Sequence, residues 1–363
     1  MKITFVLPDY RNYPVGGFKV AYEYANCLVR NGHEATIVYL QEPRKRSPYR
    51  FPLAQFSWLD SRRARLVYKS RKPKISWYSL HKDVKLVKAT DLDARRVPNA
   101  DAIFATWWRT ASRVSECHVD KGAKFYLVMD FAPWMANQHE LEQTWRLPLK
   151  KIAISGWLAE LVLQSGVPEE NVEVIPIAVD HDRFRVTNSV RRRAKRVVML
   201  YSPKPYKRSQ FGLSVLLKCK DAVPDLKASL FGPLQQQLVA PPSWSEYHGY
   251  VSESELIKLY NAASICLCSS AAEGFALPPA EAMACGCAVA TTDCGGNRDY
   301  AEHERTALVS DPDDFASLAN NVLRLLSDEE LRVKIALAGR DRIAAFTWEK
   351  STRRLIEFVN RHS

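Results

Sequence analysis

Residues 269–286 read SSAAEGFALPPAEAMACG, and this stretch decides the fold that we expect for the second half of the chain. Two consecutive prolines, at 278 and 279, are typical of a helix start, because a proline in the first turn gives up no helical hydrogen bond. An apolar run at 265–268 precedes the stretch, and another at 288–291 follows it. We therefore predict strand, loop, helix over 277–284 and strand, the repeating unit of a parallel α/β sheet.

Two glutamates belong to this loop and helix. Glu273 lies in the loop before the helix, and Glu281 lies within the first turns of the helix. The loop amides and the positive end of the helix dipole would face an anion, while the two carboxylates would accept hydrogen bonds from hydroxyl groups. This combination suits a sugar diphosphate. Taken alone, a glutamate here is equally typical of a solvent-facing helix start.

The same alternation continues around this unit. Apolar and periodic segments predict strands at 197–201 and 227–231, and helices at 210–219, 253–262 and 348–360. Long helical segments are also predicted from 315 to 346, with a break at 346–347. The basic stretch 188–196, which precedes them, is interpreted as a linker. The second half is therefore expected to form a doubly wound sheet of its own.

The first half opens as strand, glycine turn, helix and strand. The strand is predicted at 2–7, the turn at Gly16 and Gly17, the helix at 18–30 and the next strand at 34–40. Further strands are predicted at 102–106, 125–129, 151–154 and 172–175, with a helix at 156–164. Two glycines before a helix let a ligand approach the amide groups, although an ordinary tight turn needs them equally.

Length and composition agree with two globular domains. The chain has 363 residues, of which 47% are apolar and 25% charged. We predict an α/β fold of two Rossmann-like, doubly wound domains that face each other across a cleft. The first domain would cover 1–187 and the second 188–346, and a helix within 347–363 would pack back on the first.

Positive charge is concentrated in one stretch. The formal net charge is +12, and residues 41–96 hold 16 lysines and arginines against five acidic residues, with aromatic residues between them. We interpret this stretch as an insertion that binds an anionic membrane surface or a lipid-linked phosphate. Nucleic acid ranks below these because no nucleic-acid motif accompanies the charge. A solvated insertion is the alternative.

The cysteines and the N-terminal residues indicate where in the cell the protein is located. The eight cysteines form no C-x-x-C pair, and their apolar surroundings favour reduced, packed thiols over a zinc site or disulfides. The apolar run at the N-terminus is too short for a signal peptide, and no run is long enough to span a bilayer. We expect a cytoplasmic protein that binds peripherally to the inner face of the membrane.

Residues 269–286 strongly resemble the E-x7-E signature of the family 4 glycosyltransferases. The resemblance extends to 288–296, the strand predicted at 197–201, 249–251, 346–348 and 172–184. It implies the GT-B fold and a retaining, metal-independent transfer, as in polysaccharide biosynthesis. A hexose or deoxyhexose would move from a nucleoside-diphosphate sugar to a hydroxyl of a glycan, a glycolipid or lipid-linked acceptor, or a natural product. The donor would be a substrate, and no cofactor is implied.

The resemblance also implies roles for single residues. Glu273 and the amides of Gly274 and Phe275 would hold the donor sugar. Glu281 would bind the ribose hydroxyls. The remaining donor contacts would be the amides of Ala276 and Leu277 at the phosphates, Tyr250 and Val251 beside the base, and Gly16 and Gly17 in the first domain.

Two departures from the family pattern affect the candidate catalytic residues. The basic loop G-R-x4-K-G is replaced by YSPKPYKR at 201–208, which keeps positive charge but loses both glycines. Lys204 and Lys207 are the phosphate candidates, with Arg208 ranked below them. Family members often have a histidine at a position where this chain has Asp130, and the resemblance does not assign a role to this aspartate. At the junction 176–180, PIAVD replaces P-N-G-V-D.

Other readings compete with an active transferase. Asp91 and Asp93 match the D-x-D metal motif, but we interpret them as a surface turn and expect no metal site. An epimerase or phosphorylase could share the fold. The main alternative is a catalytically inactive family member that binds a nucleotide sugar or a membrane and acts as a partner protein. The altered basic loop favours it, and the intact glutamates count against it.

Overall fold

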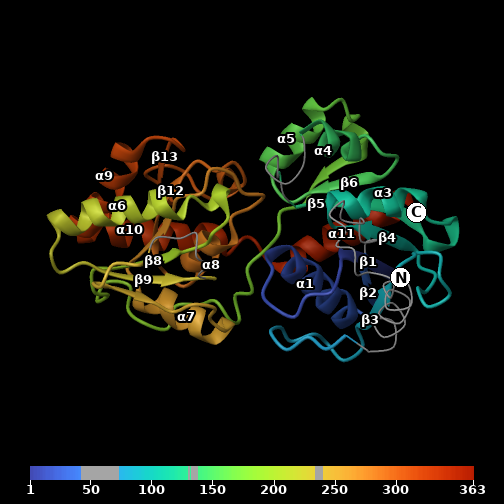
Figure 1. The fold of residues 1–363 in the computed structure, drawn as a ribbon, viewed down its shortest axis with the longest axis horizontal. Helices are drawn as coiled ribbons and strands as arrows, with labels where there is room; N and C mark the ends of the chain where they lie inside the picture. The colour runs from blue at the N-terminus through green and yellow to red at the C-terminus, as the bar shows by residue number, and fades with distance from the viewer. Residues whose placement is uncertain (42–72, 130, 132–137, 234–239) are drawn as a thin grey trace, which may run out of the picture. The chain divides into compact units, whose positions relative to one another are not determined.

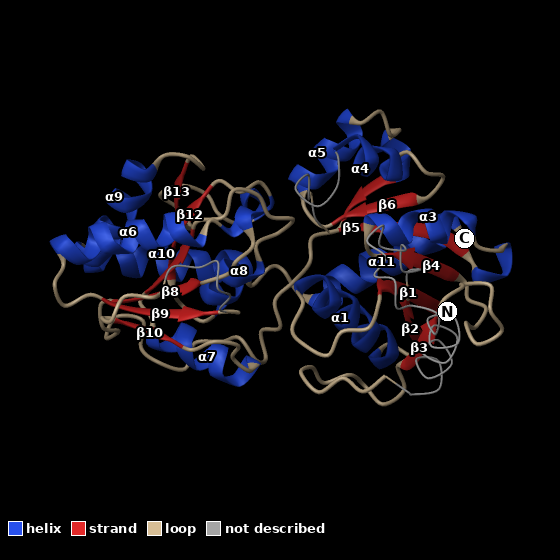
Figure 2. Cartoon of the chain, in the orientation of Figure 1, coloured by secondary structure: helices blue, strands red, loops and turns tan. Residues whose placement is uncertain are grey.

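The structure is a computed structural model that describes residues 1–41, 73–129, 131, 138–233 and 240–363 (Figure 1). It divides into two compact units. The first comprises Met1–Ala153, Leu161–Glu173 and Thr352–Ser363, and the second comprises Ile154–Glu160 and Val174–Ser351. Each unit is a parallel sheet with helices packed around it (Figure 2). The predicted α/β class, with two doubly wound sheets, is confirmed.

The first sheet has the order β3-β2-β1-β4-β5-β6-β7. Its strands are β1 (Lys2–Pro8), β2 (Glu34–Leu40), β3 (Lys85–Ala89), β4 (Ala102–Ala105), β5 (Ala123–Val128), β6 (Lys150–Ala153) and β7 (Val172–Val174). The order reverses between β1 and β4, and in such sheets ligands bind where the carboxyl ends of the strands diverge. Phe5, Phe104 and Phe125 stack across these central strands, with ring centroids 5.1 and 4.8 Å apart.

The helices of the first half begin at the carboxyl ends of strands. They are α1 (Gly16–Arg30), α3 (Trp108–Glu116), α4 (Gln138–Trp145) and α5 (Gly156–Gln164). The predicted glycine turn was wrong: Gly16 and Gly17 form the first turn of α1, and Val15 is its N-cap. A Cβ on Gly17 would lie 3.2 Å from the Met129 side chain, so glycine lets the helix start approach the end of β5.

The last helix, α11 (Trp348–His362), contributes its final residues to the first unit. Phe358 meets Phe125 with ring centroids 5.8 Å apart. Glu173 binds both Arg354 and Arg361 of this helix, at 2.8 and 2.9 Å. These contacts fasten the end of α11 within the first unit.

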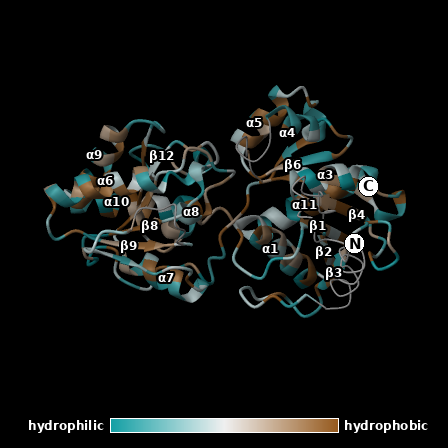
Figure 3. Ribbon diagram, viewed as in Figure 1, coloured by the Kyte–Doolittle hydropathy of each residue, from teal (hydrophilic) through white to brown (hydrophobic). Residues whose placement is uncertain are grey.

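The second sheet has the order β10-β9-β8-β11-β12-β13. Its strands are β8 (Arg196–Leu200), β9 (Lys227–Phe231), β10 (Ser245–Tyr247), β11 (Ile265–Cys268), β12 (Ala288–Thr292) and β13 (Leu308–Ser310). Its helices are α6 (Ser209–Ala222), α7 (Glu253–Ala262), α8 (Leu277–Ala284), α9 (Phe315–Ser327) and α10 (Glu329–Ile343). Figure 3 shows hydrophobic residues along its strands, as on β9. The order reverses between β8 and β11, which places the loops after both strands at one edge.

Several predicted boundaries need correction. The helical segments predicted within 315–346 end at Ile343. They are separated at Asp328, whose side chain accepts a hydrogen bond from the Leu331 amide and caps α10. Within the basic stretch 41–96, residues 42–72 lie outside the described residues. The described remainder includes β3, which pairs with β2 and is therefore sheet rather than insertion.

Two smaller expectations agree with the structure. Asp91 and Asp93 lie in an exposed turn, in which the Asp93 amide donates to the Asp91 carboxylate. All eight cysteines are free and buried. Among the helices that the structure describes, none is long and apolar enough to cross a membrane.

The predicted linker 188–196 is instead anchored in the second unit by Arg193. This side chain is 8% exposed and donates hydrogen bonds to the carbonyl oxygens of Cys285, Ala263 and Tyr260, at 2.6, 3.0 and 3.2 Å. Burial lowers the pKa of Arg193, and nearby thiols only partly offset this effect. The guanidinium therefore supplies hydrogen bonds to the ends of α7 and α8.

We expect Arg193→Ala to lower the free energy of unfolding by about 3 kcal/mol, because it leaves several buried carbonyl groups without donors. Urea denaturation followed by circular dichroism measures the change. Arg192→Ala is the matched control, since Arg192 is exposed. Equal stability of the two variants would contradict this role for Arg193.

Candidate functional site

The loops after β11 and β12 meet at the carboxyl edge of the second sheet. Glu273 and Gly295 form an isolated parallel bridge. The Glu273 amide donates to the Cys294 carbonyl at 2.8 Å, and the Gly296 amide donates to the Glu273 carbonyl at 3.0 Å. A Cβ on Gly296 would lie 2.2 Å from the Gly274 oxygen, so only glycine fits. Backbone contact therefore sets the position of Glu273.

The Glu273 carboxylate is held by two side chains. Lys207 Nζ lies 2.5 Å from Glu273 Oε1, and the Ser270 hydroxyl donates to the same oxygen at 2.6 Å. The Lys207 and Glu273 side chains are only 14% and 11% exposed. Burial by itself lowers the pKa of Lys207, but the charge and hydrogen bond of Glu273, together with Tyr206 and Cys268, outweigh burial and raise the pKa to about 12. The lysine therefore stays charged at every physiological pH.

The loop after β8 is fastened to the loop after β11. The Ala271 amide donates to the Tyr206 carbonyl at 2.7 Å. The Ser269 hydroxyl lies within hydrogen-bond distance of the carbonyl oxygens of Lys207 and Arg208, at 3.2 and 3.1 Å. Together with the bridge at Glu273, these bonds join the loops after β8, β11 and β12 into one frame.

The three basic candidates of the loop after β8 differ in availability. Lys204 is exposed and forms no ion pair within the residues that the structure describes; its Nζ lies 5.6 Å from the Tyr206 ring centroid. Arg208 pairs with Asp313 at 2.9 Å and covers the Phe211 ring at 4.2 Å. Lys204 is thus the available charge, Lys207 is shared with Glu273, and Arg208 is engaged elsewhere.

The start of α8 presents backbone donors. Ala276 is the N-cap, with a left-handed φ of 61°, and no side chain caps the helix. The amide groups at 274–277 donate to no acceptor in the described part of the chain, although Gly274, Phe275 and Ala276 are buried. Pro278 and Pro279 have no amide hydrogens. Because buried amides are nearly always paired, a bound anion is the natural acceptor for this row of donors.

Side chains beneath this row are packed rather than exposed. The Phe275 ring meets those of Tyr300 and Phe346, with centroids 5.2 and 5.8 Å apart. The Tyr300 hydroxyl donates to the Ala276 carbonyl at 2.7 Å. Only the backbone of these loop residues is therefore offered to a ligand.

Glu281 occupies a different environment from Glu273. It lies on α8, is 5% exposed, and its charge adds to burial in raising the pKa of Tyr260. The carboxylate is therefore close to Tyr260, which lies in the last turn of α7. The structure places both glutamates on the same loop and helix, as predicted, and leaves their roles as predictions.

Tyr250 and Val251 follow the short strand β10. The Gly232 amide donates to the Gly249 carbonyl at 2.8 Å, which fastens this segment to the end of β9. Tyr250 is 60% exposed, so the face of its ring is accessible. Residues 234–239, between the two strands, lie outside the described residues.

Two buried thiols lie next to this frame. Cys268 ends β11, and a hydrogen bond with Cys294 lowers its pKa to about 7 against the opposing effect of burial. Burial raises the pKa of Cys294 well above the usual range. Both cysteines are free and buried, which agrees with a packing role.

The remaining candidates belong to the first unit. Gly16 and Gly17 begin α1 at the carboxyl end of β1, and Met129 approaches Gly17 from the end of β5. Asp130 lies outside the described residues. Within the described residues, no three histidine, cysteine, aspartate or glutamate side chains gather as a metal ion requires.

Sequence reasoning missed two supporting residues. Ser270 binds the Glu273 carboxylate, and the buried Asn297 side chain accepts from the Cys294 amide at 3.1 Å and donates to the Thr292 carbonyl at 2.8 Å. Polar residues directly after β11 and β12 were the available signal, because the carboxyl ends of parallel strands share one edge.

A double-mutant cycle of Lys207→Met and Glu273→Gln tests the pair. We expect a coupling of about 2 kcal/mol in the free energy of unfolding, from the rise in the Lys207 pKa. The coupling should be complete from neutral pH up to about 10, near the ordinary lysine pKa, and should disappear as the pH rises through the raised value.

Urea denaturation of the four proteins measures this coupling. The exposed pair of Arg305 and Glu302, 2.6 Å apart, is the matched control and should show negligible coupling. The account of the Lys207 environment fails if the two pairs couple equally.

Both halves of the chain match known families. Residues 15–183 match the family model described as Glycosyltransferase Family 4, and residues 244–342 match the model described as Glycosyl transferases group 1. O-antigen chain mannosyltransferase B of Escherichia coli is 35% identical over 114 residues, which are 31% of this chain and 29% of that protein. D-inositol 3-phosphate glycosyltransferase of Corynebacterium urealyticum is 32% identical over 103 residues, 28% of this chain and 24% of that protein. The matches thus span less than a third of these relatives.

The fold also matches a solved structure. Anabaena HepE in complex with UDP and glucose has a TM-score of 0.76 at 17% identity, with 99% of this chain and 100% of that chain covered. This similarity shows a shared GT-B architecture. One stretch in each half of the sequence is therefore similar to the family 4 and group 1 glycosyltransferases.

Proposed function

We propose that this chain is a retaining, metal-independent glycosyltransferase that moves a hexose or deoxyhexose from a nucleoside-diphosphate sugar to a hydroxyl group. The row of amides at 274–277 without acceptors in the described part of the chain, three of them in buried residues, is the observation that carries the proposal. A diphosphate is an anion that such donors recognise, and a carboxylate, Glu273, lies directly beside them. The uridine diphosphate bound by HepE makes a uridine nucleotide the first donor to test.

Charge stabilisation is the main contribution that the site would make. As the sugar leaves, negative charge develops on the diphosphate, and preorganised donors stabilise it most in a site that excludes water. Lys204 and the amides at 276–277 would face this charge, with Lys207 positioned through Glu273. Glu273 and the amides of Gly274 and Phe275 would orient the sugar.

The acceptor side of the proposal rests on the first unit. In a retaining, front-face transfer, the acceptor hydroxyl forms a bond to the anomeric carbon while the bond to the diphosphate breaks. The hydroxyl proton passes to the leaving phosphate, so no protein base is required. The acceptor would bind near Gly16 and Gly17 and would be a glycan, a lipid-linked sugar or a small molecule. The basic stretch 41–96 would bind an anionic membrane on its cytoplasmic face.

A catalytically inactive family member is the second candidate. The observation that favours it is the engagement of the loop after β8: Lys207 is paired with Glu273, and Arg208 with Asp313. Such a protein would bind a nucleotide sugar without transferring the sugar. Binding and transfer therefore have to be measured separately.

Calorimetric titration with UDP, UDP-glucose and uridine tests the donor site. We expect Lys204→Met to weaken UDP binding about tenfold and to leave uridine binding unchanged, because its charge would contact only phosphate. Glu281→Gln should weaken uridine and UDP alike, because its carboxylate would bind the ribose. Lys218→Met, on the exposed face of α6, is the matched control.

The outcomes separate the candidates. Binding followed by sugar transfer to an acceptor supports the transferase. Binding with neither transfer nor donor hydrolysis favours the inactive family member. If no nucleoside diphosphate of any base binds in the millimolar range, the donor site itself is wrong.

A further inference from the structure

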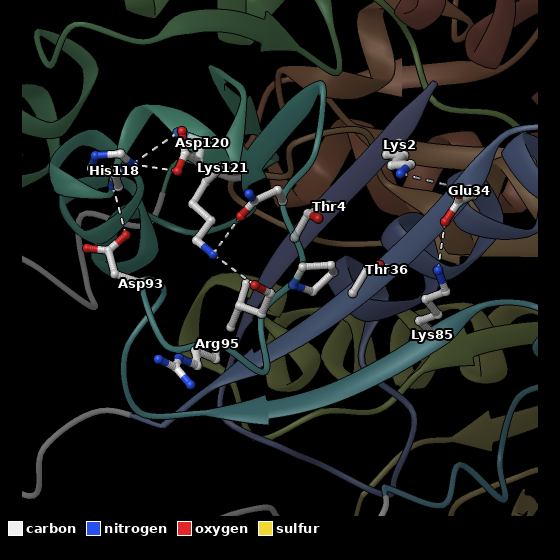
Figure 4. A pocket seen from close by; sticks show the side chains of 13 residues that line it. Lys2, Thr4, Glu34, Thr36, Lys85, Asp93, Arg95, His118, Asp120 and Lys121 are labelled. Atoms are coloured by element: carbon white, nitrogen blue, oxygen red, sulfur yellow. Dashed lines mark hydrogen bonds and ion pairs between the residues drawn. The ribbon is translucent and has the colours of Figure 1, made fainter.

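A cavity of about 670 Å³ hollows the amino edge of the first sheet (Figure 4). It lies at the beginnings of β1, β2 and β3 and is closed by the segments 93–99 and 118–121. The strands of this sheet are parallel, so this edge is opposite to the one where Gly16 and Gly17 lie. None of the predicted donor-site residues lines the cavity, which therefore needs an explanation of its own.

Lys121 brings a buried positive charge to the cavity. The residue is 6% exposed, and its ammonium donates to the Val97 carbonyl at 2.8 Å and to Asn99 Oδ1 at 3.2 Å. Both acceptors are neutral, and Lys121 forms no ion pair with any described residue. A buried charge without a counter-ion is costly, and an anion in the cavity would remove this cost.

Thr4 brings an unsatisfied hydroxyl to the same space. Its side chain is directed into the cavity from β1 (Figure 4). The residue is 1% exposed, and its Oγ1 has no hydrogen-bond partner. Buried hydroxyl groups are rarely left without a partner, so a ligand oxygen is the missing group.

Side chains at the rim of the cavity carry charges of both signs. Arg95 is exposed and makes no hydrogen bond or ion pair within the described part of the chain. Lys2 and Lys85 share the carboxylate of Glu34, at 3.9 and 2.6 Å. Asp93 and Asp120 provide further acceptors on the opposite side. Cations alone would suit a simple anion, whereas cations interleaved with carboxylates suit an anion that also carries hydroxyl groups.

We propose that this cavity binds the phosphate monoester of a sugar or another polyol. The phosphate accepts hydrogen bonds from Lys121, Arg95 and the Thr4 hydroxyl. The polyol hydroxyl groups donate to the carboxylates of Glu34, Asp93 and Asp120. The volume is in the range of small-molecule sites and exceeds the need of a bare ion. The site stands independently of the proposed transfer reaction.

Calorimetric titration of the whole protein with glucose 6-phosphate tests the proposal. We expect saturable binding in the millimolar range or tighter, and at least about tenfold weaker binding by Arg95→Ser. Thr4→Val should weaken binding about threefold without loss of thermal stability, because the lost hydroxyl had no partner. Arg96→Ser is the matched control, since Arg96 lies next to Arg95 in the same segment but does not line the cavity.

Three comparisons make the result decisive. Lys204→Met should bind glucose 6-phosphate as the unchanged protein does, which separates this cavity from the donor site. Glucose should not bind, and inorganic phosphate should bind more weakly than glucose 6-phosphate. The proposal is overturned if glucose 6-phosphate gives no saturable binding, or if Arg95→Ser binds it as tightly as the unchanged protein. Equal affinity for inorganic phosphate would overturn the polyol part.

Discussion

The arrangement of the loops after β11 and β12 depends on a steric constraint at Gly296. The loop after β12 passes the loop after β11 so closely that a Cβ at this position would lie 2.2 Å from a carbonyl oxygen. Because backbone meets backbone, the carbonyl of Glu273 is used within the protein and its carboxylate is held in one place. The amides that follow, at 274–277, are left for a ligand. A steric constraint on one loop thereby creates a polar site on its neighbour.

A second constraint concerns the basic loop that departs from the family pattern. Where that pattern ends in glycine, this chain has Arg208, yet the backbone keeps a left-handed φ of 48°. Such a conformation costs a non-glycine residue about 1 kcal/mol or more. The ion pair with Asp313 and the contact with Phe211 fasten the side chain and help to offset this cost. The loop therefore keeps its shape without glycine. Because Arg208 is paired with Asp313, Lys204 and Lys207 supply the positive charge of the loop.

The sequence predicted the long periodic elements and the loop before α8, because their apolar spacing and proline pair are strong local signals. It missed β10 and β13, which have three residues each, and β3, whose two lysines, Lys85 and Lys88, resemble a charged loop. The linker at 188–196 was misread because the burial of Arg193 depends on carbonyl groups that are distant in sequence. The pairing of Lys207 with Glu273 is likewise a tertiary contact that spacing alone could not indicate.

Hydrogen exchange of the backbone amides in the bound and free protein is the most direct test of this account. With UDP-glucose bound, the amides at 274–277 should become strongly protected, while those at the amino edge of the first sheet should keep their free rates. Protection confined to any other segment, with no change at 274–277, would contradict the central claim that these unpaired amides bind the diphosphate of the donor.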